Sequence, residues 1–368
     1  MLLIQSERNA LQAALAAVVG VVERRHTLPI LSNLLLEKKA DKLTLLATDL
    51  ELQVSTQLDA AQTGEDFAIT IAARKLFDIV RALPDTARVK LDSKDSQVVV
   101  SAGKSRFTLQ SLPAADFPRV ETGAGLGEPV RLPQKTLKRL LQLVQFAMAS
   151  QDIRYYLNGM LLVLDGNALR VVATDGHRLS YAETQLDSPV EAREVIIPRK
   201  TVMELSKLLA DVDDPVELRI GANQVTITLP GTELVTKIVD GKFPDYQRVI
   251  PASQPRHLKA NRQTVMQALQ RAAILSNEKF RGVRLVMSEN TLGIVCNNNE
   301  QEEAADEIEV SYDGDPLDVG FNVTYLLDGL GAVNADEITL SLGDANSSML
   351  LTSEGEKGFK YVVMPMRI

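Results

Sequence analysis

The sequence predicts an α+β protein in which one structural unit is repeated three times, each unit consisting of two βαβββ halves. Three observations predict this fold: a recurring segment, amphipathic helix patterns at the same spacing, and loop-like stretches between the copies. Leu43, Leu169 and Leu292 are equivalent in the recurring segment, which gives offsets of 126 and 123 residues. The three copies are KLTLLATDLEL (42–52), ALRVVATDGHRL (168–179) and TLGIVCNNNEQE (291–302).

Amphipathic helix patterns recur at almost the same spacing. They cover 73–83, 198–209 and 321–330, with offsets of 125 and 123 residues, and each follows a short β-rich run. Since independent segments share one spacing, we interpret the chain as three copies of a single unit.

The middle unit shows the order of elements most clearly. A helix is predicted over 134–148 and a second over 199–210, and each precedes three strands. Val225, Ile227 and Leu229 alternate with threonines, which is typical of a strand with one buried face. The predicted strands are 160–166, 168–175 and 177–184 in the first half, 193–198 before the second helix, and 216–221, 224–229 and 233–239 after it.

Two loop-like stretches separate the copies. Residues 121–128 (ETGAGLGE) contain three glycines, and residues 251–255 (PASQP) contain two prolines. We therefore expect domain boundaries near 125 and 252, so that the domains span 1–125, 126–252 and 253–368.

The composition is that of an ordinary globular protein. Of the 368 residues, 45% are hydrophobic, and no apolar run approaches the roughly 18 residues that span a bilayer. Cys296 is the only cysteine, so no internal disulfide is available, and the first residues do not resemble a signal peptide. We expect a cytoplasmic protein without membrane contact.

Positive charge is concentrated in the predicted helices although the chain carries a net charge of -8. The windows 74–83, 134–148, 198–210 and 261–275 contain eleven basic residues and two acids, Asp78 and Glu204. The four windows therefore carry a net charge of +9, and the rest of the chain carries -17. Basic helices on one concave surface would bind phosphates without reading base sequence. The alternative is that Lys and Arg simply favour solvated helix faces.

Domain size predicts how many copies would enclose a duplex. A domain of about 120 residues corresponds to a sphere roughly 35 Å across. Six such spheres in a ring leave a hole of about 35 Å, three leave about 5 Å, and a duplex is roughly 20 Å wide. A ring around DNA therefore needs two copies of the chain joined head to tail.

Opposite charges at the two ends of the chain favour such a joint. The last unit has the acidic residues Glu300, Glu302, Glu303, Asp306 and Glu307 near the apolar Ile274 and Leu275. The first unit has Lys75, Lys104 and Arg106 near Phe107 and Leu109. The alternative is that these are two unrelated solvated faces.

Several segments resemble the bacterial DNA polymerase III beta subunit family, the sliding clamps, over essentially the full length. They are TLPILSN (27–33), SLPAADFP (111–118), QDIRYYLNGM (151–160), ATDGHRL (173–179), GKFPDY (241–246), AAILSNEKFRGVRL (272–285), EQEEA (300–304) and YVVMPMR (361–367). The resemblance implies the DNA clamp fold, with helices inside and sheets outside a ring formed by a head-to-tail homodimer. It also implies a processivity factor without catalytic step, cofactor or metal.

The resemblance implies the partners as well. They are double-stranded DNA, the DNA polymerase III catalytic subunit, an ATP-driven clamp loader complex, and other polymerases and repair proteins. Proteins would bind through short linear peptides with hydrophobic anchors, in a pocket between the second and third units.

The family's site residues carry over to matching positions. The deeper part of the pocket matches Leu157, Thr174, Gly176, His177, Arg178, Leu179, Pro244, Arg248, Val249, Val362 and Met364. The adjoining groove matches Arg154, Tyr155, Asn322, Tyr325, Ser348, Pro365 and Met366, and Ser150 at its edge replaces a His of some relatives. The DNA contacts match Arg25, Arg74, Gln151, Tyr155 and Tyr156, to which Arg199 and Lys200 are added for their charge.

Two other functions fit parts of the sequence. An enzyme could use Asp175 and His177 as an acid-base pair, although the first copy has Leu50 and Glu51 where Gly176 and His177 stand. A repeat scaffold that binds only proteins would not be retained on DNA.

Overall fold

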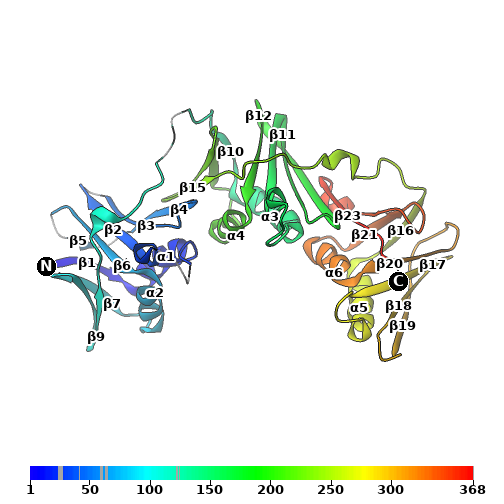
Figure 1. The fold of residues 1–368 in the computed structure, drawn as a ribbon, viewed down its shortest axis with the longest axis horizontal. Helices are drawn as coiled ribbons and strands as arrows, with labels where there is room; N and C mark the ends of the chain where they lie inside the picture. The colour runs from blue at the N-terminus through cyan, green and yellow to red at the C-terminus, as the bar shows by residue number, and fades with distance from the viewer. Residues whose placement is uncertain are drawn as a thin grey trace. The chain divides into compact units, whose positions relative to one another are not determined.

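The computed structural model describes residues 1–23, 28–40, 42–58, 61–62, 65–121, 123 and 125–367 (Figure 1). The chain forms two compact units. The first unit contains Met1–Lys135 and Glu204–Ile238, and the second contains Thr136–Met203 and Val239–Ile368. The predicted middle repeat is therefore divided between them, and each unit is described by itself below.

Two antiparallel sheets build the first unit, together with helices α1 (Arg8–Val19) and α2 (Ala73–Ala82). The pairing of β15 with β4 matters most, because it continues one sheet from the first repeat into the second. The five-stranded sheet has the order β5 (Ala61–Gln62), β1 (Leu2–Glu7), β7 (Arg88–Lys94), β8 (Gln97–Ala102), β9 (Ser105–Gln110). The eight-stranded sheet has the order β10 (Val130–Pro133), β13 (Pro215–Ile220), β14 (Gln224–Leu229), β15 (Thr232–Lys237), β4 (Leu52–Gln57), β3 (Lys42–Thr48), β2 (Asn33–Lys39), β6 (Phe67–Ala72).

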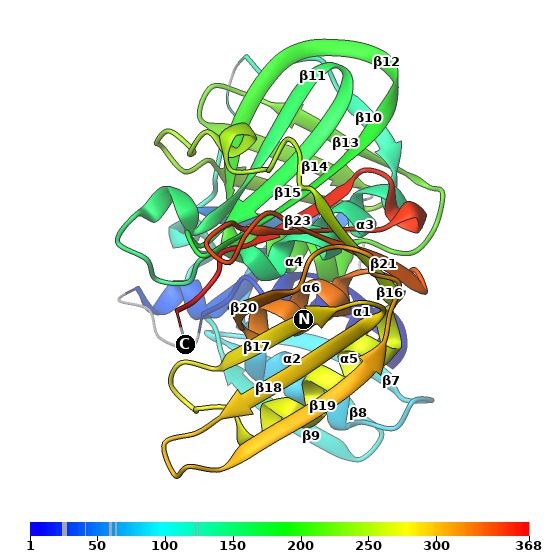
Figure 2. The same ribbon diagram turned by 90° about the vertical axis from the view of Figure 1, so that its right-hand side faces the viewer.

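The second unit has the same plan. Its six-stranded sheet continues from the second repeat into the third, because β12 pairs with β23. The order is β11 (Gly159–Thr174), β12 (Arg178–Pro198), β23 (Phe359–Val363), β22 (Met349–Thr352), β21 (Glu337–Leu342), β16 (Arg256–Asn261). The four-stranded sheet has the order β19 (Glu303–Glu309), β18 (Thr291–Asn297), β17 (Gly282–Ser288), β20 (Leu317–Asn322). Helix α5 (Arg262–Ala272) packs against β18 and β19 and against α6 (Val323–Ala332) (Figure 2).

Strands β11 and β12 are longer than predicted, since each combines two predicted strands. Their shared ladder shifts register between Leu164 and Ala168, and Gly166 there has a φ of 58°. Asp165 and Arg170 nevertheless form an ion pair at 3.1 Å, whereas a straight strand would separate them by roughly 16 Å. Each long element therefore folds back on itself, and glycine supplies the left-handed turn that this requires.

The helices form where the apolar periodicity predicts them. In α2 the buried residues are Ala73, Leu76 and Val80, one stripe of the helix. Helices α3 (Gln134–Val144) and α4 (Arg199–Leu208) also lie within their predicted ranges. Asn261 caps α5, because its side chain accepts a hydrogen bond from the Thr264 amide at 3.0 Å.

The cores are aliphatic, as the low aromatic content indicates. Cys296 is buried in β18, and burial raises the pKa of its thiol to about 11. Within the described part of the chain, no helix is long and apolar enough to cross a membrane.

Candidate functional site

A tight turn joins β11 to β12 in the second unit. The Thr174 hydroxyl donates to the Arg178 carbonyl at 2.6 Å and accepts from the Gly176 amide at 3.1 Å. The Asp175 carboxylate accepts from the amides of His177 and Arg178 at 2.9 and 3.1 Å. These bonds satisfy the polar groups of the turn and hold its shape.

A cavity of about 200 Å³, which we call the turn cavity, opens beside this turn. Leu179 and Val362 form its base and belong to the buried core of the second unit. Tyr156, Val249 and Met364 line its more exposed part, and 43% of Met364 is accessible to solvent. The full lining is Arg154, Tyr156, Leu157, Thr174, Gly176, Arg178, Leu179, Pro244, Val249, Val362 and Met364. Such a lining can take up apolar side chains of a ligand.

Arg178 fixes the wall of the turn cavity. Its guanidinium contacts Asp175 at 3.1 Å, Asp328 of α6 at 2.5 Å and the Phe146 carbonyl at 2.8 Å. It also lies over the Tyr325 ring, 4.4 Å from the centroid. Burial opposes the charge of Arg178, but Tyr361, Asp328 and Asp175 raise its pKa, so the side chain is held charged in one position.

The loop before β11 is held by reciprocal hydrogen bonds. The Asp152 amide donates to the Asn158 side chain at 2.9 Å, and the Asn158 amide group donates to the Asp152 carbonyl at 2.8 Å. The Arg154 side chain lowers the pKa of Asp152 to about 2, so this pair stays charged near neutral pH. The loop thus presents Tyr155, 58% exposed, in a defined position.

Gly176 cannot be replaced without disturbing this site. Its φ of 89° disfavours any side chain, and a Cβ would lie 2.9 Å from Nη1 of Arg154. We expect Gly176→Ala to lower the free energy of unfolding by about 1–2 kcal/mol and to displace Arg154 from the turn cavity. Thermal unfolding measures the loss of stability. Arg154→Ala alone is the control, because it removes the Arg154 side chain from the turn cavity without straining the backbone at Gly176. Unchanged stability would contradict the strain at this turn.

The structure brings together most residues predicted for the deeper pocket. Nine of those eleven residues line the turn cavity, and the exceptions are His177 and Arg248. The His177 ring stacks on Tyr325 with 6.5 Å between the centroids. The Arg248 side chain is 87% exposed and pairs with Asp245 at 2.9 Å.

The residues predicted for the adjoining groove have several structural roles. Arg154 lines the turn cavity itself. Asn322 caps α6 by accepting from the amides of Thr324 and Tyr325. The Ser348 carbonyl accepts from the Gln254 side chain at 2.8 Å, and the Met366 amide donates to the Gly320 carbonyl at 2.8 Å. Pro365 is half-buried, between Met364, which lines the turn cavity, and Met366.

Sequence reasoning missed two features of the cavity. Tyr156 was expected to contact DNA, yet it lines the turn cavity, while its neighbour Tyr155 is exposed. Two adjacent tyrosines in the sequence do not reveal which of them is the more buried. Asp328 carries no signal either, because it reaches Arg178 across 150 residues of sequence.

The residues predicted to bind DNA differ in their exposure to solvent and in the hydrogen bonds that their side chains make. Gln151 is exposed with a φ of 55°, and Arg74 is exposed while donating to the Val22 carbonyl. Arg199 donates to the Met148 carbonyl at 2.9 Å, and Lys200 is half-buried. Arg25 lies outside the described residues.

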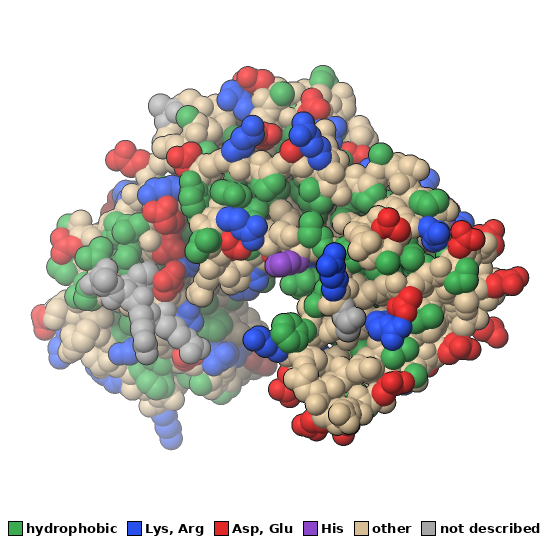
Figure 3. All heavy atoms as spheres, turned by 45° about the vertical axis from the view of Figure 1, so that its right-hand side comes forward, with side chains coloured by type: hydrophobic (Ala, Val, Ile, Leu, Met, Phe, Trp, Pro, Cys, Tyr) green, Lys and Arg blue, Asp and Glu red, His purple; other side chains and the backbone are tan. Residues whose placement is uncertain are grey.

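Acids outside the helices neutralise part of the predicted basic charge. Lys135 pairs with Asp213 at 2.7 Å, and Arg271 pairs with Asp306 at 2.6 Å. Lys75 and Lys138 form no ion pair with any residue that the structure describes. On the face seen in Figure 3, acidic and basic side chains lie interspersed. The surplus of +9 counted along the helices therefore overstates the free positive charge.

Most of the residues predicted for a joint between copies lie at two sheet edges or beside them. Arg106, Phe107 and Leu109 belong to β9, the last strand of the five-stranded sheet, and Lys104 precedes it. Lys75 is exposed on α2. Glu303 begins β19, the last strand of the four-stranded sheet, and Glu300 and Glu302 precede it. Ile274 is 78% exposed and Leu275 half-buried, directly after α5.

The geometry gives Asp175 a structural role. Its carboxylate bonds the backbone of the turn and the Arg178 guanidinium, whereas the His177 ring lies against Tyr325. An acid-base pair would need the carboxylate and the imidazole in hydrogen-bond contact. Among the described residues, no cluster of His, Cys, Asp and Glu could hold a metal ion.

Comparisons with known proteins agree along the whole chain. Three sequence-family models match: the DNA polymerase III beta subunit N-terminal domain at residues 2–121, its central domain at 131–245 and its C-terminal domain at 247–367. The chain belongs to the DNA polymerase III beta subunit family. Members of this family are beta sliding clamps, and the chain shares their non-enzymatic processivity function and their three-domain DNA clamp fold. The predicted α+β fold class is thereby confirmed.

Individual relatives are similar over nearly their full length. The beta sliding clamp of Pseudomonas putida is 46% identical over 365 residues, covering 98% of this chain and 99% of the relative. That of Escherichia coli is 45% identical over 362 residues, with the same coverage. The crystal structure of the Pseudomonas aeruginosa subunit is 44% identical, covers both chains fully and superposes with a TM-score of 0.93. A second Pseudomonas aeruginosa structure, bound to griselimycin, has a TM-score of 0.95 at 44% identity and full coverage.

Proposed function

We propose that two copies of the chain join head to tail into a ring that encircles double-stranded DNA. The ring slides along the duplex and tethers the DNA polymerase III catalytic subunit, the clamp loader complex and other polymerases and repair proteins. Each copy contributes domains 1–125, 126–252 and 253–368, and the ring works in the cytoplasm.

The turn cavity is the observation that carries the tethering function. It is apolar at its base, open at Met364, and lined by residues from β11, β12 and the end of the chain. A disordered peptide would insert its hydrophobic anchor there, and the entropy lost on docking keeps partners exchangeable. We propose that griselimycin, which a relative binds, also binds this chain.

The two outer sheet edges support the head-to-tail joint. Strand β9 carries Arg106 and Phe107, and β19 carries Glu303 and Glu307, so the edges are opposite in charge. An unpaired edge strand can pair with a strand of another molecule. Pairing β9 of one copy with β19 of the other would cover Phe107 and Ile274 at the same time.

DNA topology tests this function. The protein is loaded onto nicked circular DNA, which is then linearised. We expect retention on the circle and loss from the linear form, because a ring can slide off an end. An ordinary DNA-binding protein would stay on both forms, and a protein scaffold would stay on neither; either outcome would contradict the ring.

The cavity assignment predicts a specific loss of polymerase binding. Met364→Asp places a charge at the opening of the turn cavity, and we expect at least about a hundredfold weaker binding of the polymerase. Val212→Asp is the matched control, since Val212 is 40% exposed and belongs to the other unit. Surface plasmon resonance on both variants checks this, and equal affinities would refute the cavity assignment.

A further inference from the structure

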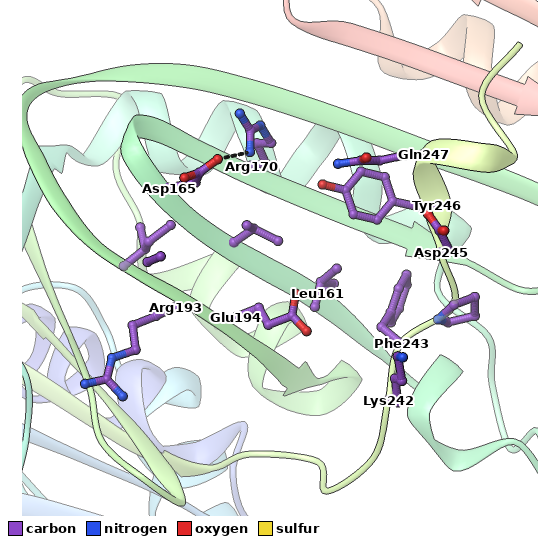
Figure 4. Close-up of a pocket in the computed structure, with 14 residues that line it drawn as sticks. Leu161, Asp165, Arg170, Arg193, Glu194, Lys242, Phe243, Asp245, Tyr246 and Gln247 are labelled. Atoms are coloured by element: carbon purple, nitrogen blue, oxygen red, sulfur yellow. Dashed lines mark hydrogen bonds and ion pairs between the residues drawn. The ribbon is translucent and has the colours of Figure 1, made fainter. Parts of the chain in front are cut away.

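A second cavity of about 520 Å³, which we call the outer cavity, adjoins the turn cavity (Figure 4). It lies between the folded-back strands β11 and β12 and the segment 242–247. Pro244 lines both cavities, so one residue forms part of each wall. A chain that leaves the turn cavity past Pro244 would enter the outer cavity.

The outer cavity has an apolar floor. Leu161 and Phe243 are buried in the core cluster, and Val163 and Tyr246 pack against that cluster with part of their surface exposed. Figure 4 shows the rings of Phe243 and Tyr246 on the same side of the cavity as Leu161. This floor can receive one or two apolar side chains but is too open to enclose a small ligand.

Charges of both signs surround this floor. Arg170 is engaged by Asp165 at 3.1 Å and by Glu183 at 3.2 Å. Lys242 and Glu194 are exposed and form no ion pair among the described residues, which leaves them available to a ligand. A phosphate chain would meet no basic surplus here, whereas a peptide can satisfy both charges.

We infer that the outer cavity binds the residues that flank the hydrophobic anchor of a partner peptide. The inference rests on the proposed function, because the anchor must occupy the turn cavity. Continuity through Pro244, the apolar floor and the two available charges together favour a polypeptide flank. The flank would add affinity and would distinguish partners that share the same anchor.

Two synthetic peptides test this inference on the full-length protein. Both carry adjacent Leu and Phe anchors and a fluorophore, and one continues for about five residues, enough to span roughly 17 Å. The extension contains one further Leu between a Lys and a Glu. We expect the longer peptide to bind about tenfold more tightly, as burial of one apolar side chain allows. Equal affinities would overturn the inference.

A floor variant separates the two cavities. Val163 lines the outer cavity and not the turn cavity. Val163→Lys should abolish the tenfold gain and leave the short peptide's affinity unchanged, which shows that the variant is still folded around the turn cavity. Retention of the gain would overturn the inference. Failure of both peptides to bind the unmodified protein would overturn the proposed function and this inference with it.

A labelling experiment remains informative if Val163→Lys unfolds. Because Cys296 is buried, a new exposed cysteine can be labelled selectively. Gln247→Cys lies at the outer cavity, and Ser188→Cys is exposed elsewhere on β12 as the control. A quencher at the end of the longer peptide should quench a dye at residue 247 and not at 188. Equal quenching at both positions would overturn the inference.

Discussion

Replacing Ile274 and Leu275 by Asp should convert the proposed head-to-tail dimer into monomers and abolish retention on circular DNA. Ile274 is 78% exposed in the single chain, so covering it in the joint would remove a large apolar side chain from water and stabilise the joint. Two carboxylates in that position would be buried without partners, at a cost of several kcal/mol in each joint. A head-to-tail ring of two copies contains the joint twice, so the loss is doubled.

Light scattering and the linearisation assay together check this prediction. We expect half the molecular mass and no protein on nicked circles, while the isolated chain still binds the anchor peptide in the turn cavity. Val212→Asp again serves as the control and should remain dimeric. A dimer that survives the double substitution would place the joint elsewhere.

Arg178→Leu should destabilise the second unit and disrupt the turn cavity. The guanidinium joins the β11–β12 turn to α6 through Asp175 and Asp328, and it also bonds the Phe146 carbonyl. Removing it leaves two carboxylates without their cation. We expect the free energy of unfolding to fall by about 3 kcal/mol, the lower end for a broken buried pair, because Asp328 is 37% exposed.

Chemical denaturation measures this loss, and Asp328→Leu in the Arg178→Leu background tests its cause. The double variant should regain part of the stability, since it removes a carboxylate left without its partner. Lys138→Leu is a suitable control, because Lys138 forms no ion pair within the described residues. A double variant as unstable as the sum of both single variants would show that Asp328 and Arg178 do not interact.

Much of the fold follows from local patterns. The period of apolar residues located helices α2 to α6 to within a few residues, whereas no window was given for α1. The repeat spacing predicted three equivalent units. The prediction of separate strands over 160–166 and 168–175 was incomplete, because both belong to one ladder that bends at Gly166. A glycine turn between two apolar runs does not reveal whether the backbone pairing is interrupted.

The candidate site could not be predicted from patterns in the sequence. Its residues were carried over from the family resemblance, and no pattern in the chain pointed to a cavity. The helix charges also suggested more free positive charge than the structure leaves, because Asp213 and Asp306 lie outside the helices that they neutralise. Pairing across loops depends on side chains whose distance in sequence carries no information about their distance in space.

The sequence by itself determined the repeated unit, its helices and the family, because periodicity, turn residues and motifs act over a few positions. Only the tertiary structure decided that Tyr156 lines the turn cavity and that Asp328 holds Arg178. It also decided that Pro244 stands between two cavities. These arrangements result from packing between distant segments, where burial and shape select the partners.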